Sequence, residues 1–319
     1  MNEGTFEHRV KRIKDIIRRI KSSTEAATNL VSKVLKTLER EGLIREDIVP
    51  ERPPGRIAGV DGSFRSFTAF VRPLTIVKVT IAIQEGNKLR ALGPYDGDHI
   101  TIYYEDDVVI EEESLKMLSD EAMAAIKALR VSDFVLIDGP FVNPPKDIRI
   151  ESEAFKVNLR NRIELIRSRR AAAIVKRIRR GILTRDLPKI DEELREMRKV
   201  SEAVLLIKVL EKIREDGYSG PIVIGPFGPE TISYEDGSSE SLYQRYVQRS
   251  PMHKPVVLET STDSFPTRLL NEDVRINDRR ASIPNVLQLA HELSRITDEE
   301  SRAFYNMFYR VLRWVSEGS

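Results

Sequence analysis

Two stretches, RIAGVDGSFRS at residues 56–66 and FVLIDGPFVNP at residues 134–144, each end an apolar run on an aspartate followed by a glycine. Short, continuously apolar runs of this kind are typical of strands buried on both faces. In open α/β sheets, ligands bind at the carboxyl ends of such strands. We therefore expect Asp61 and Asp138 each to end a buried strand, and to lie side by side if the two strands are neighbours.

Two carboxylates a few ångströms apart repel each other, and the pKa of one of them rises. A divalent cation relieves that repulsion, and oxygen ligands suit Mg²⁺ or Mn²⁺. The alternative is that each Asp-Gly is only a turn, because this dipeptide is a common turn former. The occurrence of the pair on two predicted strands favours the metal site.

The residues around these stretches predict the fold class. Residues 56–110 are rich in β-branched and aromatic residues, and QEGNK at 84–88 is typical of a hairpin turn, so we expect three to five strands, partly antiparallel. Residues 114–130 have the spacing of an amphipathic helix and precede the second Asp-Gly strand. Antiparallel strands, a helix and then a strand ending in aspartate predict an α/β fold with a ribonuclease H-like mixed sheet core.

The rest of the chain supplies helices and further strands. Residues 5–45 predict two helices, 190–215 another helix, and the segments 171–178, 220–228 and 254–261 predict strands. We expect a single domain over 1–319 with N-terminal helices in 1–50, a sheet core in 55–145 and 170–260, a basic helical insertion in 146–215, and C-terminal helices in 284–319.

Composition limits the function classes. The chain has 319 residues, is 32% charged and 40% hydrophobic, and carries a net charge of only +2, so nucleic-acid binding must depend on local basic density. It contains no cysteine, which excludes disulfides, zinc–thiolate sites, iron–sulfur clusters and cysteine nucleophiles. The charged N-terminus and the lack of an apolar run of about 18 residues predict a cytoplasmic protein.

A metal site built on two aspartates calls for a third ligand. Glu121 lies in the helix before the second Asp-Gly strand and borders its apolar face; the alternatives are an ordinary helix glutamate, favoured by the helix dipole, and the run of acids at 111–113. Among the four histidines, His291 lies in a predicted helix. It is either structural, a metal ligand, or a proton donor to a leaving oxygen.

Taken together, GVDGSFRS at 59–66, LSDEAMAAIKALRVSDFVLIDGPF at 118–141 and IPNVLQLAHELSRI at 283–296 resemble the NurA family of archaeal and bacterial DNA-end nucleases. The resemblance implies a ribonuclease H-like core and a manganese-dependent nuclease. Such an enzyme cuts single-stranded DNA, resects duplex ends 5′ to 3′ in break repair by homologous recombination, forms a homodimer and docks on a HerA-type hexameric translocase.

Carried over by matching motifs, the resemblance implies that Asp61, Glu121 and Asp138 bind the metal and that His291 lies near it. The implied mechanism is two-metal phosphodiester hydrolysis with Mn²⁺ or Mg²⁺. The family often has a tyrosine–proline pair before the histidine helix. This chain has Ile283-Pro284 there instead, so any role of that tyrosine is lost or moved.

Candidate DNA contacts come from basic and aromatic residues. Residues 154–180 contain ten Lys and Arg side chains but only one acid, Glu164, which favours phosphate binding over a solvated helix face; Lys176, Arg177 and Arg179 are the candidates. Phe64 or Phe141 could stack on bases, whereas the alternative is that they belong to the core.

Other functions remain open from the sequence. A haloacid dehalogenase-type phosphatase would need an acid two residues before Asp61, where the chain has Gly59. An actin- or sugar-kinase-like ATPase would need a second phosphate loop, for which VIGPFGPETIS at 223–233 is the candidate. A helical adaptor without catalytic activity would need neither aspartate.

Overall fold

The computed structural model describes residues 3–46, 55–69, 72–92, 98–104, 110–142, 153–176, 178, 181–215, 217–233, 239–264, 266, 269 and 283–317. Within these residues, ten strands form one mixed sheet in the order β1-β8-β9-β10-β7-β6-β2-β3-β4, with β5 paired to β3. The neighbouring strands β2, β6 and β7 run parallel, and the other pairs are antiparallel. The predicted α/β class with a mixed sheet is confirmed.

The strands are β1 (Ile44–Arg45), β2 (Ile57–Ala69), β3 (Arg72–Glu85), β4 (Lys88–Ala91), β5 (Asp98–Tyr104), β6 (Phe134–Asp138), β7 (Ala171–Val175), β8 (Ile222–Ser233), β9 (Ser239–Gln248) and β10 (Val256–Thr260). The predicted antiparallel start of the sheet, with its hairpin between β3 and β4, is confirmed. The sequence did not predict β9, because this strand carries Gln244 and Arg245 at fully buried positions where apolar residues are expected.

The helices are α1 (Glu3–Arg40), α2 (Ile110–Ala128), α3 (Glu153–Ser168), α4 (Ile182–Ile190), the 3-10 helix η1 (Glu192–Lys199), α5 (Glu202–Ile213), α6 (Asn285–Ser294) and α7 (Asp298–Glu317). The prediction of two N-terminal helices is wrong, because residues 21–29 contain neither proline nor glycine and the helix continues through them. The single helix predicted over 190–215 is also wrong: Asp191 accepts a hydrogen bond from the Glu193 N–H and starts η1 as a separate element.

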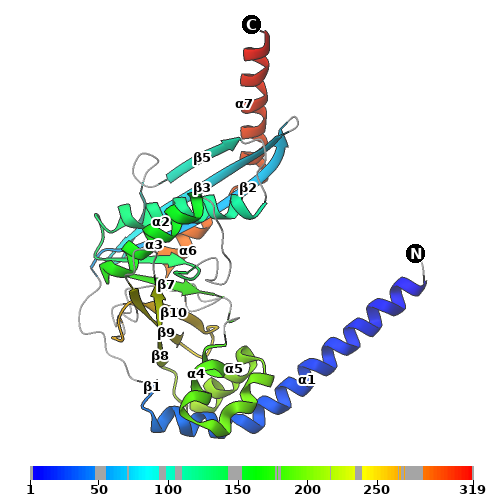
Figure 1. The fold of residues 1–319 in the computed structure, drawn as a ribbon, viewed down its shortest axis with the longest axis vertical. Helices are drawn as coiled ribbons and strands as arrows, with labels where there is room; N and C mark the ends of the chain where they lie inside the picture. The colour runs from blue at the N-terminus through cyan, green and yellow to red at the C-terminus, as the bar shows by residue number, and fades with distance from the viewer. Residues whose placement is uncertain are drawn as a thin grey trace.

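Helices cover both faces of the sheet (Figure 1). On one face, α2 and α3 pack over β2, β3, β6 and β7, and α1, α4 and α5 pack over β8, β9 and β10. On the other face, α6 packs over β2 and β3 with Val286, Leu287 and Ala290 fully buried. No helix in the described part of the chain is both long and apolar enough to cross a bilayer.

Strand β2 faces both helix layers in turn, because successive side chains point to opposite faces. Ala58 and Val60 belong to the cluster under α2 and α3, whereas Ile57 belongs to the cluster under α6. By the same alternation, Gly59 and Asp61 face α6 and Gly62 faces α2. The stretch 56–66 therefore sets the positions of two helices as well as of one aspartate.

Candidate metal centre

Asp61 and Asp138 lie next to each other on neighbouring parallel strands. The parallel pairing of β2 with β6 runs from Ile57 opposite Phe134 to Val60 opposite Ile137, so the two aspartates are the next residues on each strand. The expectation that these strands are neighbours is confirmed. Asp61 does not end its strand, however. β2 continues to Ala69, because from Asp61 onward it still pairs with β3.

His291 joins the two aspartates from α6. Its Nδ1 lies 2.6 Å from Asp61 Oδ2 and 3.9 Å from Asp138 Oδ2. One ligand atom from each of these three residues lies within 4.8 Å of the other two, a geometry that could hold a metal ion. Ser294, one turn further along α6, donates a hydrogen bond to the same Asp61 oxygen at 3.3 Å. Asp61 is thereby held between a strand and a helix.

Two glycines allow the helices to come this close to β2. A Cβ on Gly59 would lie 2.6 Å from the carbonyl oxygen of Val286 and 2.7 Å from the nitrogen of Leu287, both backbone atoms of α6. A Cβ on Gly62 would lie 3.2 Å from side-chain atoms of Met117 and Val79. The residues that flank Asp61 therefore place His291 on one side of the strand and α2 on the other.

The negative charges of Asp61 and Asp138 are not fully balanced by positive charge in this group of side chains. Burial and the nearby charge of Asp61 raise the pKa of Asp138, while Lys176 opposes the rise. The hydrogen bond to Asp61 raises the pKa of His291, so the imidazole gains a proton more readily than usual. Both groups therefore bind a proton more readily than usual. A divalent cation between the carboxylates would supply the positive charge in place of the proton.

A divalent cation fits the residues present. Carboxylate oxygens suit Mg²⁺ and Mn²⁺, and an imidazole nitrogen suits transition-metal ions, so the three residues together can hold a divalent cation. The ammonium of Lys176, which follows β7, already donates a hydrogen bond to Asp138 Oδ2 and stands where positive charge is needed. Thr80, the cross-strand partner of Asp61, is fully buried, and its hydroxyl has no hydrogen-bond partner among the described residues. That hydroxyl could bind a water on the ion.

Glu121 lies close to this group but outside it. Its side chain is buried in α2, and its Oε2 accepts a hydrogen bond from Arg162 Nη2 at 2.8 Å. Burial raises the pKa of Glu121 to about 8; Asp61 and Asp138 add to the rise, and Arg162 opposes it. The charges of both aspartates therefore act on Glu121, and one of its carboxylate oxygens accepts a hydrogen bond from Arg162.

The other predicted residues have these positions. Phe64 is half-buried and packs against the apolar cluster under α2, and Phe141 is fully buried in that cluster. Arg177 and Arg179 lie outside the described residues. Ile283 is buried among apolar residues under α6. The segment 223–233, considered as a phosphate loop, is part of strand β8.

Sequence reasoning missed three residues that hold the site: Ser294, Arg162 and Glu259. Glu259 is a fully buried acid in β10 that accepts a hydrogen bond from the Phe141 N–H, in the turn after Asp138. The sequence does contain a pattern that points to Arg162 and to Glu259. Arg162 and Asn158 are four residues apart on the buried stripe of α3, and Glu259 interrupts the apolar run of VVLET at 256–260.

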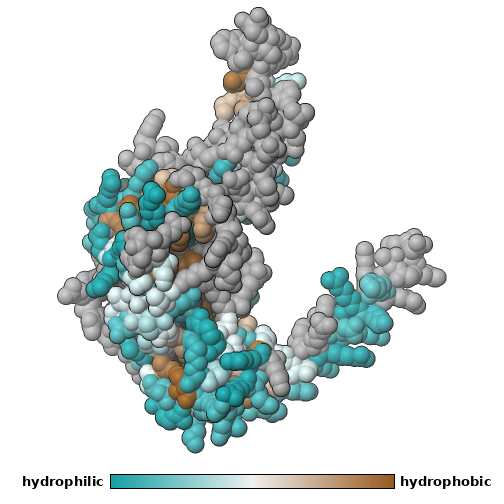
Figure 2. Space-filling model, in the orientation of Figure 1, coloured by the Kyte–Doolittle hydropathy of each residue, from teal (hydrophilic) through white to brown (hydrophobic). Residues whose placement is uncertain are grey.

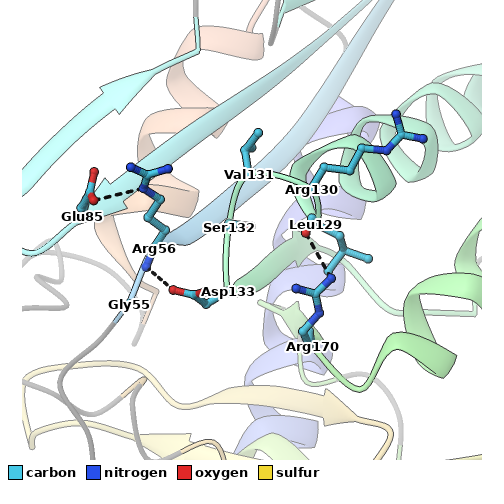
Figure 3. A pocket seen from close by; sticks show the side chains of 9 residues that line it. All are labelled: Gly55, Arg56, Glu85, Leu129, Arg130, Val131, Ser132, Asp133 and Arg170. Carbon is cyan, nitrogen blue, oxygen red and sulfur yellow. Dashed lines mark hydrogen bonds and ion pairs between the residues drawn. The ribbon is translucent and has the colours of Figure 1, made fainter.

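A pocket of about 560 Å³ lies at the opposite end of the parallel strands (Figure 3). It is lined by residues that precede β2, β6 and β7, among them Arg56, Asp133 and Arg170. Arg56 pairs with Glu85, and Asp133 accepts a hydrogen bond from the backbone N–H of Arg56. This pocket contains none of the candidate metal ligands.

Known proteins are similar to this chain in sequence pattern and in fold. The NurA crystal structure from Sulfolobus solfataricus is 13% identical over 98% of both chains, with a TM-score of 0.69. A crystal structure of NurA with manganese is 12% identical, with a TM-score of 0.55 over 96% of this chain and 98% of that one. These likenesses show the fold; no curated protein matches the chain.

The family comparison extends over most of the chain. The NurA domain matches residues 55–296, which include every candidate metal ligand named above. The match begins just before β2 and ends just after α6, so it takes in the strands and the helix that bring Asp61, Asp138 and His291 together. The chain therefore belongs to the NurA family.

Proposed function

We propose that this chain is a divalent-metal-dependent nuclease that hydrolyses phosphodiester bonds of DNA. The observation that carries the proposal is the group of Asp61, Asp138 and His291 at adjacent positions of two parallel strands and one helix. Membership of the NurA family supports it, and the existence of a NurA structure with manganese supports the choice of metal.

In this proposal Asp61 and Asp138 would hold Mn²⁺ or Mg²⁺, and Glu121 would bind a second ion or orient the attacking water. A bound ion supplies Lewis-acid stabilisation of the charge on the phosphate and lowers the pKa of a bound water. His291 binds the ion, or donates a proton from Nε2 to the leaving 3′ oxygen while Nδ1 faces Asp61. Lys176 neutralises phosphate charge once it leaves Asp138.

The finer parts of the proposal follow from the family resemblance. They are a two-metal mechanism, endonuclease activity on single strands, 5′ to 3′ resection of duplex ends, a homodimer and docking on a HerA-type hexameric translocase. Basic residues of 154–180 other than the buried Arg162, together with the half-buried Phe64, would contact the DNA. The one segment considered as the second phosphate loop of the rival ATPase, residues 223–233, is part of strand β8.

The test is degradation of labelled single-stranded DNA with Mn²⁺, with EDTA, and by two variants, with and without a HerA-type translocase. Asp61→Asn should lower the rate by at least about 100-fold, because it removes a charged ligand from the ion. Asp133→Asn is the matched control, since Asp133 precedes the same strand β6 that Asp138 ends.

Equal cutting by Asp61→Asn and the wild-type protein would overturn the site. Absence of cutting by the wild-type protein with every metal, both with and without the translocase, would overturn the function.

A further inference from the structure

Arg162 in α3 is an arginine buried in the protein interior. Its exposed fraction is 2%, and each of its three side-chain nitrogens donates a hydrogen bond. Nε donates to Asn158 Oδ1 at 2.9 Å, Nη1 to the Pro140 carbonyl at 2.8 Å and Nη2 to Glu121 Oε2 at 2.8 Å. Burying a guanidinium is costly unless its partners are well placed. The identity of those partners therefore indicates what the arginine is for.

Two of the three partners adjoin the candidate metal centre. Burial and the charges of Asp61 and Asp138 raise the pKa of Glu121 in α2, and Pro140 is two residues beyond Asp138. One planar guanidinium thus joins the helix acid to the turn that carries the second strand aspartate. Because the donors of an arginine are in a fixed fork, the distance between these two groups is fixed as well.

The same turn is held from its other side. Glu259 Oε2 accepts a hydrogen bond from the Phe141 N–H at 2.8 Å, and Glu259 Oε1 accepts one from Gln244 Nε2 at 2.9 Å. The turn begins at Gly139, whose φ of +82° lies in the left-handed region. A buried guanidinium therefore holds the carbonyl of Pro140, and a buried carboxyl group holds the N–H of Phe141.

We propose that Arg162 is a positioning residue of the metal centre: by binding Glu121 Oε2 and the Pro140 carbonyl together, it presents Glu121 Oε1 and the Asp138 carboxylate to the ion in one fixed arrangement. The proposal rests on the proposed metal-dependent function. It predicts that loosening Arg162 weakens metal binding without removing any ligand, as loss of residues that orient ligands does in other metal sites.

The experiment compares Mn²⁺ affinity of the wild-type protein, Arg162→Lys and Arg245→Lys, by titration with electron paramagnetic resonance of free Mn²⁺. Lysine keeps the charge but loses the fork that spans two partners. Arg245 is the matched control. It is 1% exposed and donates to Thr260 Oγ1 and to the carbonyls of Thr262 and Asp263, away from the metal centre.

We expect Arg162→Lys to weaken Mn²⁺ binding by about 10- to 100-fold, and Arg245→Lys to leave it within about threefold of wild type. In DNA cleavage, Arg162→Lys should need correspondingly more Mn²⁺ and should regain its rate when Mn²⁺ is raised. Circular dichroism without metal separates this result from partial unfolding, because added metal would also refold a destabilised variant. If Arg162→Lys does not fold, Asn158→Ala, which removes the acceptor of the Arg162 Nε–H and leaves its Nη1 and Nη2 hydrogen bonds, should still weaken Mn²⁺ binding several-fold.

Equal Mn²⁺ affinity of the folded Arg162 or Asn158 variant and Arg245→Lys would overturn the positioning role while leaving the proposed nuclease intact. A wild-type protein that neither binds Mn²⁺ nor cuts DNA would overturn the proposed function, and the positioning role with it.

Discussion

At the scale of single residues, the candidate metal centre holds protons that a metal would have to displace. The pKa of Glu121 is raised to about 8, mainly by burial, and the pKa values of Asp138 and His291 are raised as well. A metal binds the deprotonated forms of these groups, so binding releases protons. Glu121, Asp138 and His291 come from three separate elements, but their protonation is linked because the charge of Asp61 contributes to the shift of each.

We therefore expect Mn²⁺ affinity to increase as pH rises. Each raised pKa leaves more of the group protonated at neutral pH. Raising the pH removes those protons, and the deprotonated groups bind the metal more tightly. Between about pH 6 and pH 9 the wild-type protein should show a steeper rise in affinity than Glu121→Gln, which has no proton to lose at this position.

Calorimetric titration of Mn²⁺ in buffers of different ionisation enthalpy measures the protons released. The same pH dependence in the wild-type protein and in Glu121→Gln would show that Glu121 is ionised before the metal arrives.

At the scale of secondary-structure elements, the close approach of α6 to β2 decides whether His291 reaches Asp61. The approach depends on Gly59, because a side chain there would meet backbone atoms of Val286 and Leu287, which cannot rotate away. Gly62 on the opposite face meets only side chains, which can adjust. A side chain is therefore tolerated less well at Gly59 than at Gly62.

We expect Gly59→Ala to destabilise the protein by about 1–3 kcal/mol, the usual range for overpacking, and to weaken Mn²⁺ binding because α6 and His291 must move outward. Gly62→Ala is the matched control and should have a smaller effect on both quantities. Denaturant unfolding and Mn²⁺ titration of both variants measure the difference. Gly59→Ala with wild-type stability and affinity would mean that α6 does not need this contact.

At the scale of the whole molecule, two helices extend beyond the body. Figure 1 shows the N-terminal half of α1 and most of α7 projecting away from the sheet. The first turn of α7 is anchored by an ion pair between Lys78 and Glu300 at 2.9 Å, but Met307 and Val311 further along are 50% and 54% exposed. In Figure 2, hydrophilic residues cover much of the described part of the projecting half of α1.

Exposed apolar residues on a projecting helix favour an interface with another chain, and we expect a homodimer that buries α7. The double substitution Met307→Glu and Val311→Glu should convert the dimer to a monomer, because it places two charges in an apolar contact. Light scattering after size-exclusion chromatography measures the mass. The control is Asn306→Glu, an exposed polar position of the same helix, which should leave the mass unchanged.

A dimer that persists in the double variant would exclude α7 from the interface, and a monomeric wild-type protein would overturn the homodimer itself.

Much of this architecture could be predicted from the sequence, because it depends on local patterns. The apolar runs that end on Asp61 and Asp138, the hairpin of β3 and β4, and the spacing of α2 are visible in the printed chain. The motifs around Asp61, Glu121, Asp138 and His291 were also enough to suggest the family to which the chain belongs. Each of these signals lies within a few consecutive residues.

The way in which those residues are held depends on contacts between distant parts of the chain. The register of β2 and β6 puts the aspartates side by side, Gly59 brings α6 onto Asp61, and Arg162 joins Glu121 to the turn after Asp138. The partners of Arg162 include residues 22 and 41 positions away, and Glu259 is 118 positions from Phe141. Local periodicity is set by neighbours along the chain, so it carries no information about such distant pairs; they are determined when the sheet and its helices pack.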